Sequence, residues 1–183
     1  MSILIDTGIF YALLDKGDAN YMDALAIVAH VLEGKFGKAV TTDYVILETT
    51  LLLKARIGPE VVKAFLNFLE QSGITTIIID EETFKKALKL LKKRPKSLSL
   101  CDAATLTIIK DWSINNLATF NLRSFKNLTT NIVGKGYFNT LNSDEKEKTK
   151  PQTHISKNLE KQKTMKNQPN KYLYFRIFLL LKK

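Results

Sequence analysis

The segment SLSLCDAATLTIIKDW, residues 97–112, opens a helix that carries one carboxylate in its first turn. Ser99 is followed three residues later by Asp102, just ahead of an apolar run. This spacing is typical of a capping box, in which both side chains accept hydrogen bonds from backbone N–H groups at the helix start. A carboxylate in that position is also a metal ligand where it faces a cleft shared with other acids. The segment alone favours the cap and leaves both interpretations open.

Asp6 is the first of two further acids that bear on this choice. The apolar run of residues 3–5 predicts a buried strand, which ends at Asp6 before a short helix over residues 9–14. In open α/β sheets ligands bind at the carboxyl ends of the strands, which makes Asp6 a candidate site residue. Asp6 is equally placed to be the N-cap of the following helix.

Glu48 is the second of these acids, in the middle of a helix predicted over residues 44–56. That helix is apolar nearly all round, which predicts burial on several faces. An unpaired buried carboxylate costs several kcal/mol or takes up a proton, so Glu48 needs a cation, a basic partner or access to water. The alternative is an ordinary glutamate that reaches solvent between Thr49 and Lys54.

Strands alternate with helices along the chain, which predicts an α/β fold with a parallel sheet covered on both faces. The predicted strands are residues 3–5, 38–41, 74–79, 117–118 and 132–133. The predicted helices are residues 9–14, 21–32, 44–56, 59–70, 83–91 and 99–111. The basic run KKRPK, residues 92–96, is interpreted as a solvated helix end, with contact to phosphates as the alternative.

The composition disfavours several classes of site. The chain has two histidines, His30 and His154, too few and too scattered for a zinc site or a histidine-based triad. Cys101 is the single cysteine, which excludes an internal disulfide, indicates a reducing compartment such as the cytoplasm, and is expected to be a small buried hydrophobe. We expect no secretory signal, since the N-terminus lacks a basic stretch followed by a long apolar run.

The basic excess is concentrated in the last quarter of the chain. The formal net charge is +10, and residues 139–183 hold 11 basic and 4 acidic side chains. A basic chain favours polyanionic partners, nucleic acid first and anionic membrane surfaces second. Residues 139–183 are rich in Lys and Asn, and we predict a disordered tail that ends in the apolar segment of residues 172–181. That segment is too short to span a bilayer.

Four segments, taken together, resemble PIN-domain nucleases of the VapC-like toxin group. They are ILIDTGIFYALLD (3–15), TTDYVILETTLLL (41–53), LSLCDAATL (98–106) and ATFNLRSF (118–125), in the order and spacing of that family. The resemblance covers residues 2 to about 138, and we take residues 1–138 as the nuclease domain. It implies a three-layer α/β/α PIN-like fold with a central, mostly parallel sheet.

The resemblance also implies an activity and a site. It implies a metal-dependent endoribonuclease, a hydrolase in which Asp6, Glu48 and Asp102 hold Mg²⁺ or Mn²⁺ for attack of water on a phosphodiester. Thr7, Ser99 and Thr119 match hydroxyl positions around the family's site. The implied partners are RNA and a small antitoxin protein, in a toxin–antitoxin pair, and the implied state is a homodimer without a transmembrane span.

One residue departs from the family pattern. Asn121 stands where the family commonly has a fourth aspartate, and an amide oxygen brings no charge to a cation. Asn121 therefore motivates a second hypothesis, a catalytically impaired PIN domain that binds RNA. A phosphoryl-receiver domain is a weaker third, because Thr7 and Gly8 do not supply the paired acids expected after its first strand.

Overall fold

A parallel sheet forms the centre of the molecule. The computed structural model describes residues 1–125 and 130–149, and within them five strands are hydrogen-bonded in the order β3-β2-β1-β4-β5. All four strand pairs are parallel. The strands are β1 (Ser2–Ile5), β2 (Lys38–Thr42), β3 (Thr75–Ile77), β4 (Asn116–Ala118) and β5 (Asn131–Val133). The predicted strands are confirmed, although β3 ends two residues earlier than expected.

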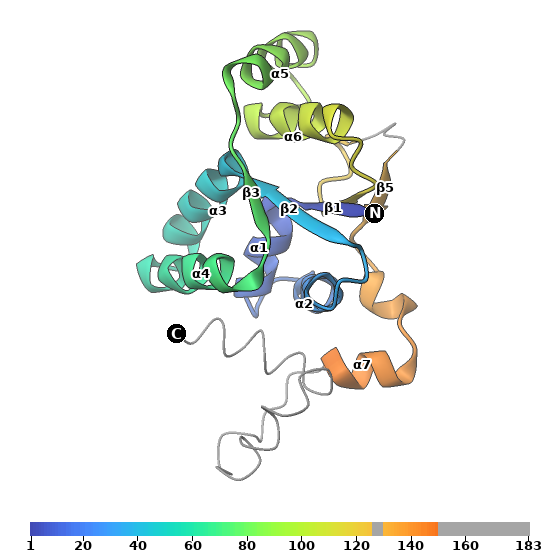
Figure 1. The fold of residues 1–183 in the computed structure, drawn as a ribbon. Helices are drawn as coiled ribbons and strands as arrows, with labels where there is room; N and C mark the ends of the chain where they lie inside the picture. The colour runs from blue at the N-terminus through green and yellow to red at the C-terminus, as the bar shows by residue number, and fades with distance from the viewer. Residues whose placement is uncertain (126–129, 150–183) are drawn as a thin grey trace.

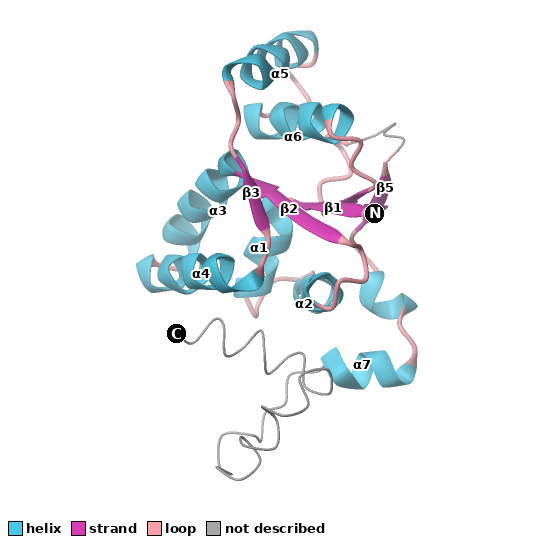
Figure 2. Ribbon diagram, in the orientation of Figure 1, coloured by secondary structure: helices cyan, strands magenta, loops and turns pink. Residues whose placement is uncertain are grey.

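Helices cover both faces of this sheet. Figure 1 shows α5 and α6 on one face and α1 to α4 on the other, and Figure 2 shows the strands between the two helical layers. The helices are α1 (Thr7–Leu14), α2 (Tyr21–Leu32), α3 (Asp43–Arg56), α4 (Pro59–Ser72), α5 (Glu81–Lys93) and α6 (Leu100–Asp111). The three-layer α/β/α prediction is therefore confirmed.

The central strand β1 joins the two hydrophobic cores. Successive side chains of a strand point to opposite faces of the sheet. Ile3 and Ile5 accordingly belong to the core under α1 to α4, which includes Phe10, whose ring lies 5.2 Å from that of Phe65. Leu4 belongs instead to the core on the other face. All three β1 residues are fully buried, so the end of β1 is held rigidly from both sides.

Helix α3 is less buried than its composition predicts. Val45 and Leu53 are fully buried, but Leu47 and Leu51 remain 59% and 61% exposed. The prediction of burial on several faces is wrong, because within the described residues α3 packs mainly on the side that faces α1, α4 and α6. Among the residues that the structure describes, this helix therefore presents an exposed apolar face that includes Leu47 and Leu51.

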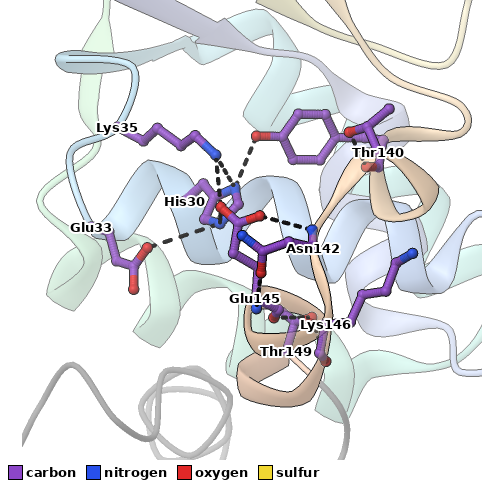
Figure 3. Close-up of polar contacts among 9 residues, drawn as sticks. His30, Glu33, Lys35, Thr140, Asn142, Glu145, Lys146 and Thr149 are labelled. Atoms are coloured by element: carbon purple, nitrogen blue, oxygen red, sulfur yellow. Dashed lines mark hydrogen bonds and ion pairs between the residues drawn. The ribbon is translucent and has the colours of Figure 1, made fainter.

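The chain beyond β5 continues in order against α2. Residues 139–149 contain the end of a 3₁₀ helix, η1 (Tyr137–Thr140), and α7 (Ser143–Thr149), so the prediction of disorder is wrong for these residues. In Figure 3 the Glu145 side chain of α7 lies close to both His30 of α2 and Lys35. The rest of the predicted tail, residues 150–183 with its apolar segment, lies outside the described residues. Along the described ranges we find no helix with the length and apolar character needed to cross a membrane.

Candidate functional site

Asp6 lies at the carboxyl edge of the sheet, directly after the central strand. Ile5 pairs with Ala118 across β1 and β4, so Asp6 and Thr119 follow side by side at the same edge. The Thr119 hydroxyl donates a hydrogen bond to Asp6 Oδ2 at 2.6 Å. Asp6 occupies the N-cap position of α1, but its side chain makes no capping hydrogen bond. The Asp6 side chain therefore does not cap α1, and its role as a site residue stays a prediction.

Glu48 projects from α3 toward the start of α1. The Thr7 hydroxyl donates to Glu48 Oε2 at 2.5 Å, which links the first turn of α1 to the middle of α3. Glu48 is half-buried rather than enclosed. Its carboxylate thus has a neutral partner together with partial access to water, and the cost of burying it is smaller than the sequence indicates.

Asp102 caps α6 and contributes to the same edge of the molecule. Asp102 N donates to Ser99 Oγ at 3.0 Å, and Ser99 N donates to Asp102 Oδ2 at 2.9 Å, so the predicted capping box is confirmed. The other carboxylate oxygen, Oδ1, accepts from Asn121 Nδ2 at 3.3 Å. The cap therefore does not occupy the whole carboxylate, and the capping role is compatible with a role in a site.

The three carboxylates influence one another electrostatically. Burial raises the pKa of Asp6 to about 6, opposed by the hydrogen bond from Thr119 and reinforced by the negative charges of Asp102 and Glu48. Asp6 is 6% exposed. A buried aspartate whose pKa is raised by burial and further by neighbouring acids indicates a region of negative potential that favours a cation or a proton.

Cys101 lies within the electrostatic influence of the same three acids. Burial raises the pKa of its thiol, and the charges of Glu48, Asp6 and Asp102 raise that pKa further. The thiol therefore stays protonated at neutral pH and is no nucleophile. The prediction that Cys101 is a buried small side chain is confirmed.

The described part of the chain brings no basic side chain into an ion pair with Asp6, Glu48 or Asp102. Across the same residues no three His, Cys, Asp or Glu side chains form a ready group of metal ligands. Each carboxylate is instead turned toward a neutral donor. The chemistry of the set, three hard oxygen donors without a counter-charge, fits Mg²⁺ or Mn²⁺, although the side chains would have to converge further around the ion.

Ser124 is a further residue of this site that sequence reasoning missed. It is 4% exposed, and its hydroxyl lies 3.0 Å from Asp102 Oδ2. Ser124 N also donates to Asn121 Oδ1 at 3.3 Å. The spacing of Asn121 and Ser124, three residues apart, is compatible with a side-chain-capped turn and is the signal that was available in the sequence.

Comparisons with known proteins agree with this architecture. The family model of the PIN domain matches residues 3–130. A VapC ribonuclease of Archaeoglobus fulgidus is 32% identical over 151 residues, a match that covers 81% of this chain and 92% of that protein. The family match spans all three acids and the loop that contains Asn121.

A solved structure gives the same fold. The crystal structure of the toxin VapC20 of Mycobacterium tuberculosis, described as cleaving the sarcin-ricin loop, superposes with a TM-score of 0.58. At 21% identity, over 67% of this chain and 92% of that one, this likeness supports the fold alone. From the family match and the level of identity to a VapC ribonuclease, we conclude that this chain belongs to the PIN-domain family, in the group of VapC-like ribonucleases.

Proposed function

We propose that this chain is a divalent-metal-dependent endoribonuclease that acts in the cytoplasm as the toxin of a toxin–antitoxin pair. The observation that carries the proposal is the set of three carboxylates, Asp6, Glu48 and Asp102, with neutral donors and no cationic partner among the described residues. Such a set is costly for folding, since Asp6 is buried near the negative charges of Asp102 and Glu48. A bound cation offsets that cost and gives the acids a chemical role.

In this proposal the residues of the site have two roles, to bind the ion and to orient its ligands. Asp6, Glu48 and Asp102 would hold the ion, and Thr119 and Thr7 would orient the first two by their hydrogen bonds. When bound, Mg²⁺ or Mn²⁺ would supply positive charge that neutralises the phosphodiester and makes water a stronger nucleophile at neutral pH. Because its pKa is raised to only about 6, Asp6 is mostly deprotonated at neutral pH and would already be in the form that binds the ion.

The partners follow from the family and from the exposed face of α3. The names of the relatives, a ribonuclease and a toxin, favour RNA as the substrate, and the resemblance to the VapC-like toxin group favours a small antitoxin as the regulator. Leu47 and Leu51 are exposed on the same helix that carries Glu48, so a protein covering these leucines would lie beside the site. We therefore propose an antitoxin contact on this face, and a homodimer, which size-exclusion chromatography with light scattering would test.

A catalytically impaired RNA-binding PIN domain is the second candidate, and Asn121 favours it. The amide supplies no charge where the family commonly has an acid, and a net charge of +10 favours binding of a polyanion. Tight, salt-sensitive RNA binding without cleavage in Mn²⁺ would establish this candidate over the enzyme.

The test is cleavage of a mixed single-stranded RNA pool by the full-length protein in Mg²⁺, in Mn²⁺ and in EDTA. We expect cleavage by wild type in either ion, none in EDTA, and a loss of about 1,000-fold for Asp6→Asn and for Asp102→Asn. Asp144→Asn, a change at an exposed position of α7, is the matched control and should leave the rate unchanged. Equal cleavage by wild type and Asp6→Asn would refute the proposed site.

A further inference from the structure

In the loop after β4, the side chains of Asn121 and Ser124 both contact the Asp102 carboxylate, and we call these two residues the clasp. Asn121 Nδ2 lies 3.3 Å from Asp102 Oδ1 and 2.8 Å from Ser124 Oγ. Ser124 Oγ in turn lies 3.0 Å from Asp102 Oδ2, so the two oxygens of this carboxylate each meet one neutral side chain of the loop. The two loop residues are also tied to each other, since Ser124 N donates to Asn121 Oδ1 at 3.3 Å.

The same loop is connected to Asp6. Asn121 N donates to Thr119 Oγ1 at 3.0 Å, and the Thr119 hydroxyl donates to Asp6 Oδ2 at 2.6 Å. A continuous series of hydrogen bonds therefore runs from Asp102 through Asn121 and Thr119 to Asp6. Asp102 lies on α6 and Asp6 follows β1, so this series fixes acids from opposite parts of the chain relative to each other.

The far side of the loop is anchored to the segment between α5 and α6. Arg94 Nη2 donates to the Ser124 carbonyl at 3.2 Å. The Ser97 carbonyl, 3.0 Å from Ser124 Oγ, is an alternative acceptor to Asp102 for the single proton of that hydroxyl. Arg94 belongs to the basic run of residues 92–96, for which the sequence indicates a solvated helix end or a phosphate contact. The structure gives this arginine a third role, as an anchor for the loop.

We propose that Asn121 and Ser124 are positioning residues, a neutral clasp that sets the Asp102 carboxylate relative to Asp6 before a cation binds. This inference rests on the proposed metal-dependent function. It adds Asn121 and Ser124, which contact Asp102 and would not contact the ion, to the residues on which that function depends. An aspartate at position 121 would place an acceptor 3.3 Å from Asp102 Oδ1 and would repel it in the absence of an ion. The asparagine donates there instead, so the ion-free site is already ordered.

Asparagine at position 121 should limit the number of cations that the site binds. With a donor at position 121, the site has three carboxylates and should take one divalent cation per chain. With an acid at position 121, the site gains a fourth carboxylate, and its stability should depend more strongly on the ion. The asparagine at position 121 therefore supplies no fourth carboxylate ligand. It instead donates a hydrogen bond that orders the Asp102 carboxylate.

The experiment measures Mn²⁺ binding by calorimetry and thermal unfolding of the full-length protein in EDTA and in Mn²⁺. We expect one Mn²⁺ per wild-type chain, and a dissociation constant about 10- to 100-fold weaker in Asn121→Ala and Ser124→Ala. Asn121 is exposed, so its replacement should leave the fold intact. Asn121→Asp should unfold at a lower temperature than wild type in EDTA and gain more than wild type from Mn²⁺.

The controls are Asn139→Asp, at an exposed position, and Ser72→Ala, which removes a hydroxyl that donates to the Leu69 carbonyl. Both should bind Mn²⁺ as wild type does. If wild type binds Mn²⁺ and the two clasp variants bind it equally well, the clasp is refuted and the proposed function stands. If wild type binds no Mn²⁺ at millimolar concentration, the proposed metal site is refuted. The positioning role of Asn121 and Ser124 is then refuted as well.

Discussion

Two groups of partly buried carboxylates in this molecule have opposite surroundings. Glu145 of α7 lies 3.3 Å from Lys35 Nζ and 3.9 Å from His30 Nε2, and Glu33 lies 4.0 Å from the same imidazole nitrogen (Figure 3). Asp6, Glu48 and Asp102 have only neutral hydrogen-bond donors among the described residues. We call these the α7 cluster and the acid site.

The difference separates a structural arrangement from a functional one. In the α7 cluster the acids face basic groups, and the Tyr137 hydroxyl lies 2.8 Å from His30 Nδ1, so the polar atoms are largely satisfied within the chain. In the acid site the negative charges reinforce one another and raise the pKa of Asp6. Neutralising Glu145 should therefore lower the stability of the protein, whereas neutralising the buried Asp6 should raise its stability and abolish the proposed activity.

The largest expected effect is on catalysis. Glu48→Gln should lower the rate of RNA cleavage about 1,000-fold, equal to about 4 kcal/mol, because the amide keeps the shape of the side chain and removes its charge. Initial rates on a labelled single-stranded RNA in Mg²⁺ measure this. Glu70→Gln at an exposed position of α4 is the control. A Glu48→Gln rate within tenfold of wild type would remove Glu48 from the site.

The second effect is a pH dependence of stability that originates in Asp6. Its pKa is about 6 in the folded protein against the ordinary 3.8, so between these pH values the folded protein holds a proton that the unfolded chain has lost. Stability should fall as the pH rises through this window, by about 3 kcal/mol for this group. Urea unfolding in EDTA from pH 4 to 8 measures the slope, and Asp6→Asn should remove this contribution. An identical slope in both proteins would show that Asp6 does not titrate in this window.

Removal of the Tyr137 hydroxyl in the α7 cluster should have a smaller effect, a reduced free energy of unfolding. Tyr137→Phe leaves His30 Nδ1, in a residue only 4% exposed, without the oxygen that lies 2.8 Å away. This should lower the free energy of unfolding by about 1.5 kcal/mol without changing Mn²⁺ affinity. Tyr44→Phe on α3 is the control for loss of a tyrosine hydroxyl. A change in Mn²⁺ affinity in Tyr137→Phe would mean that the two regions are coupled.

The smallest expected effect is the loss of stability caused by Glu145→Gln. Its side chain is 30% exposed, and its pKa is lowered chiefly by the hydrogen bond from Asn142 N and by Lys35. Glu145→Gln should cost about 1 kcal/mol of stability at pH 7, a cost that shrinks in 1 M salt because screening weakens the ion pair. Urea unfolding at two salt concentrations measures this, and a salt-independent loss would assign the effect to the helix cap alone.

The sequence predicted the fold well because its strongest signals are local. The run Ile3–Ile5, the helical periodicities and the Ser99–Asp102 capping box are set by nearby residues, and each is confirmed. The placement of Asp6 beside Thr119 depends on the pairing of β1 with β4, which the rule for the carboxyl ends of parallel strands anticipates. The assignment of the three acids as metal ligands stays a prediction.

The features that the sequence did not predict depend on tertiary contacts. Helix α7 has few apolar residues, and its position depends on Glu145 meeting Lys35, more than 100 residues away in the chain. Ser124 acquires its role only because α6 brings Asp102 to the loop after β4. The exposure of Leu47 and Leu51 could not be predicted either, since apolar composition does not say whether a neighbouring element or a separate partner covers a helix.

The most direct test of the account compares Asp6→Asn with Glu145→Gln by urea unfolding at pH 7.5, first in EDTA and then in Mn²⁺. We predict opposite signs in EDTA, with Asp6→Asn more stable than wild type and Glu145→Gln less stable. Mn²⁺ should then stabilise wild type and Glu145→Gln but have little effect on Asp6→Asn. If Asp6→Asn is less stable than wild type in EDTA, or gains as much as wild type from Mn²⁺, the acid site is not the uncompensated cation site described here.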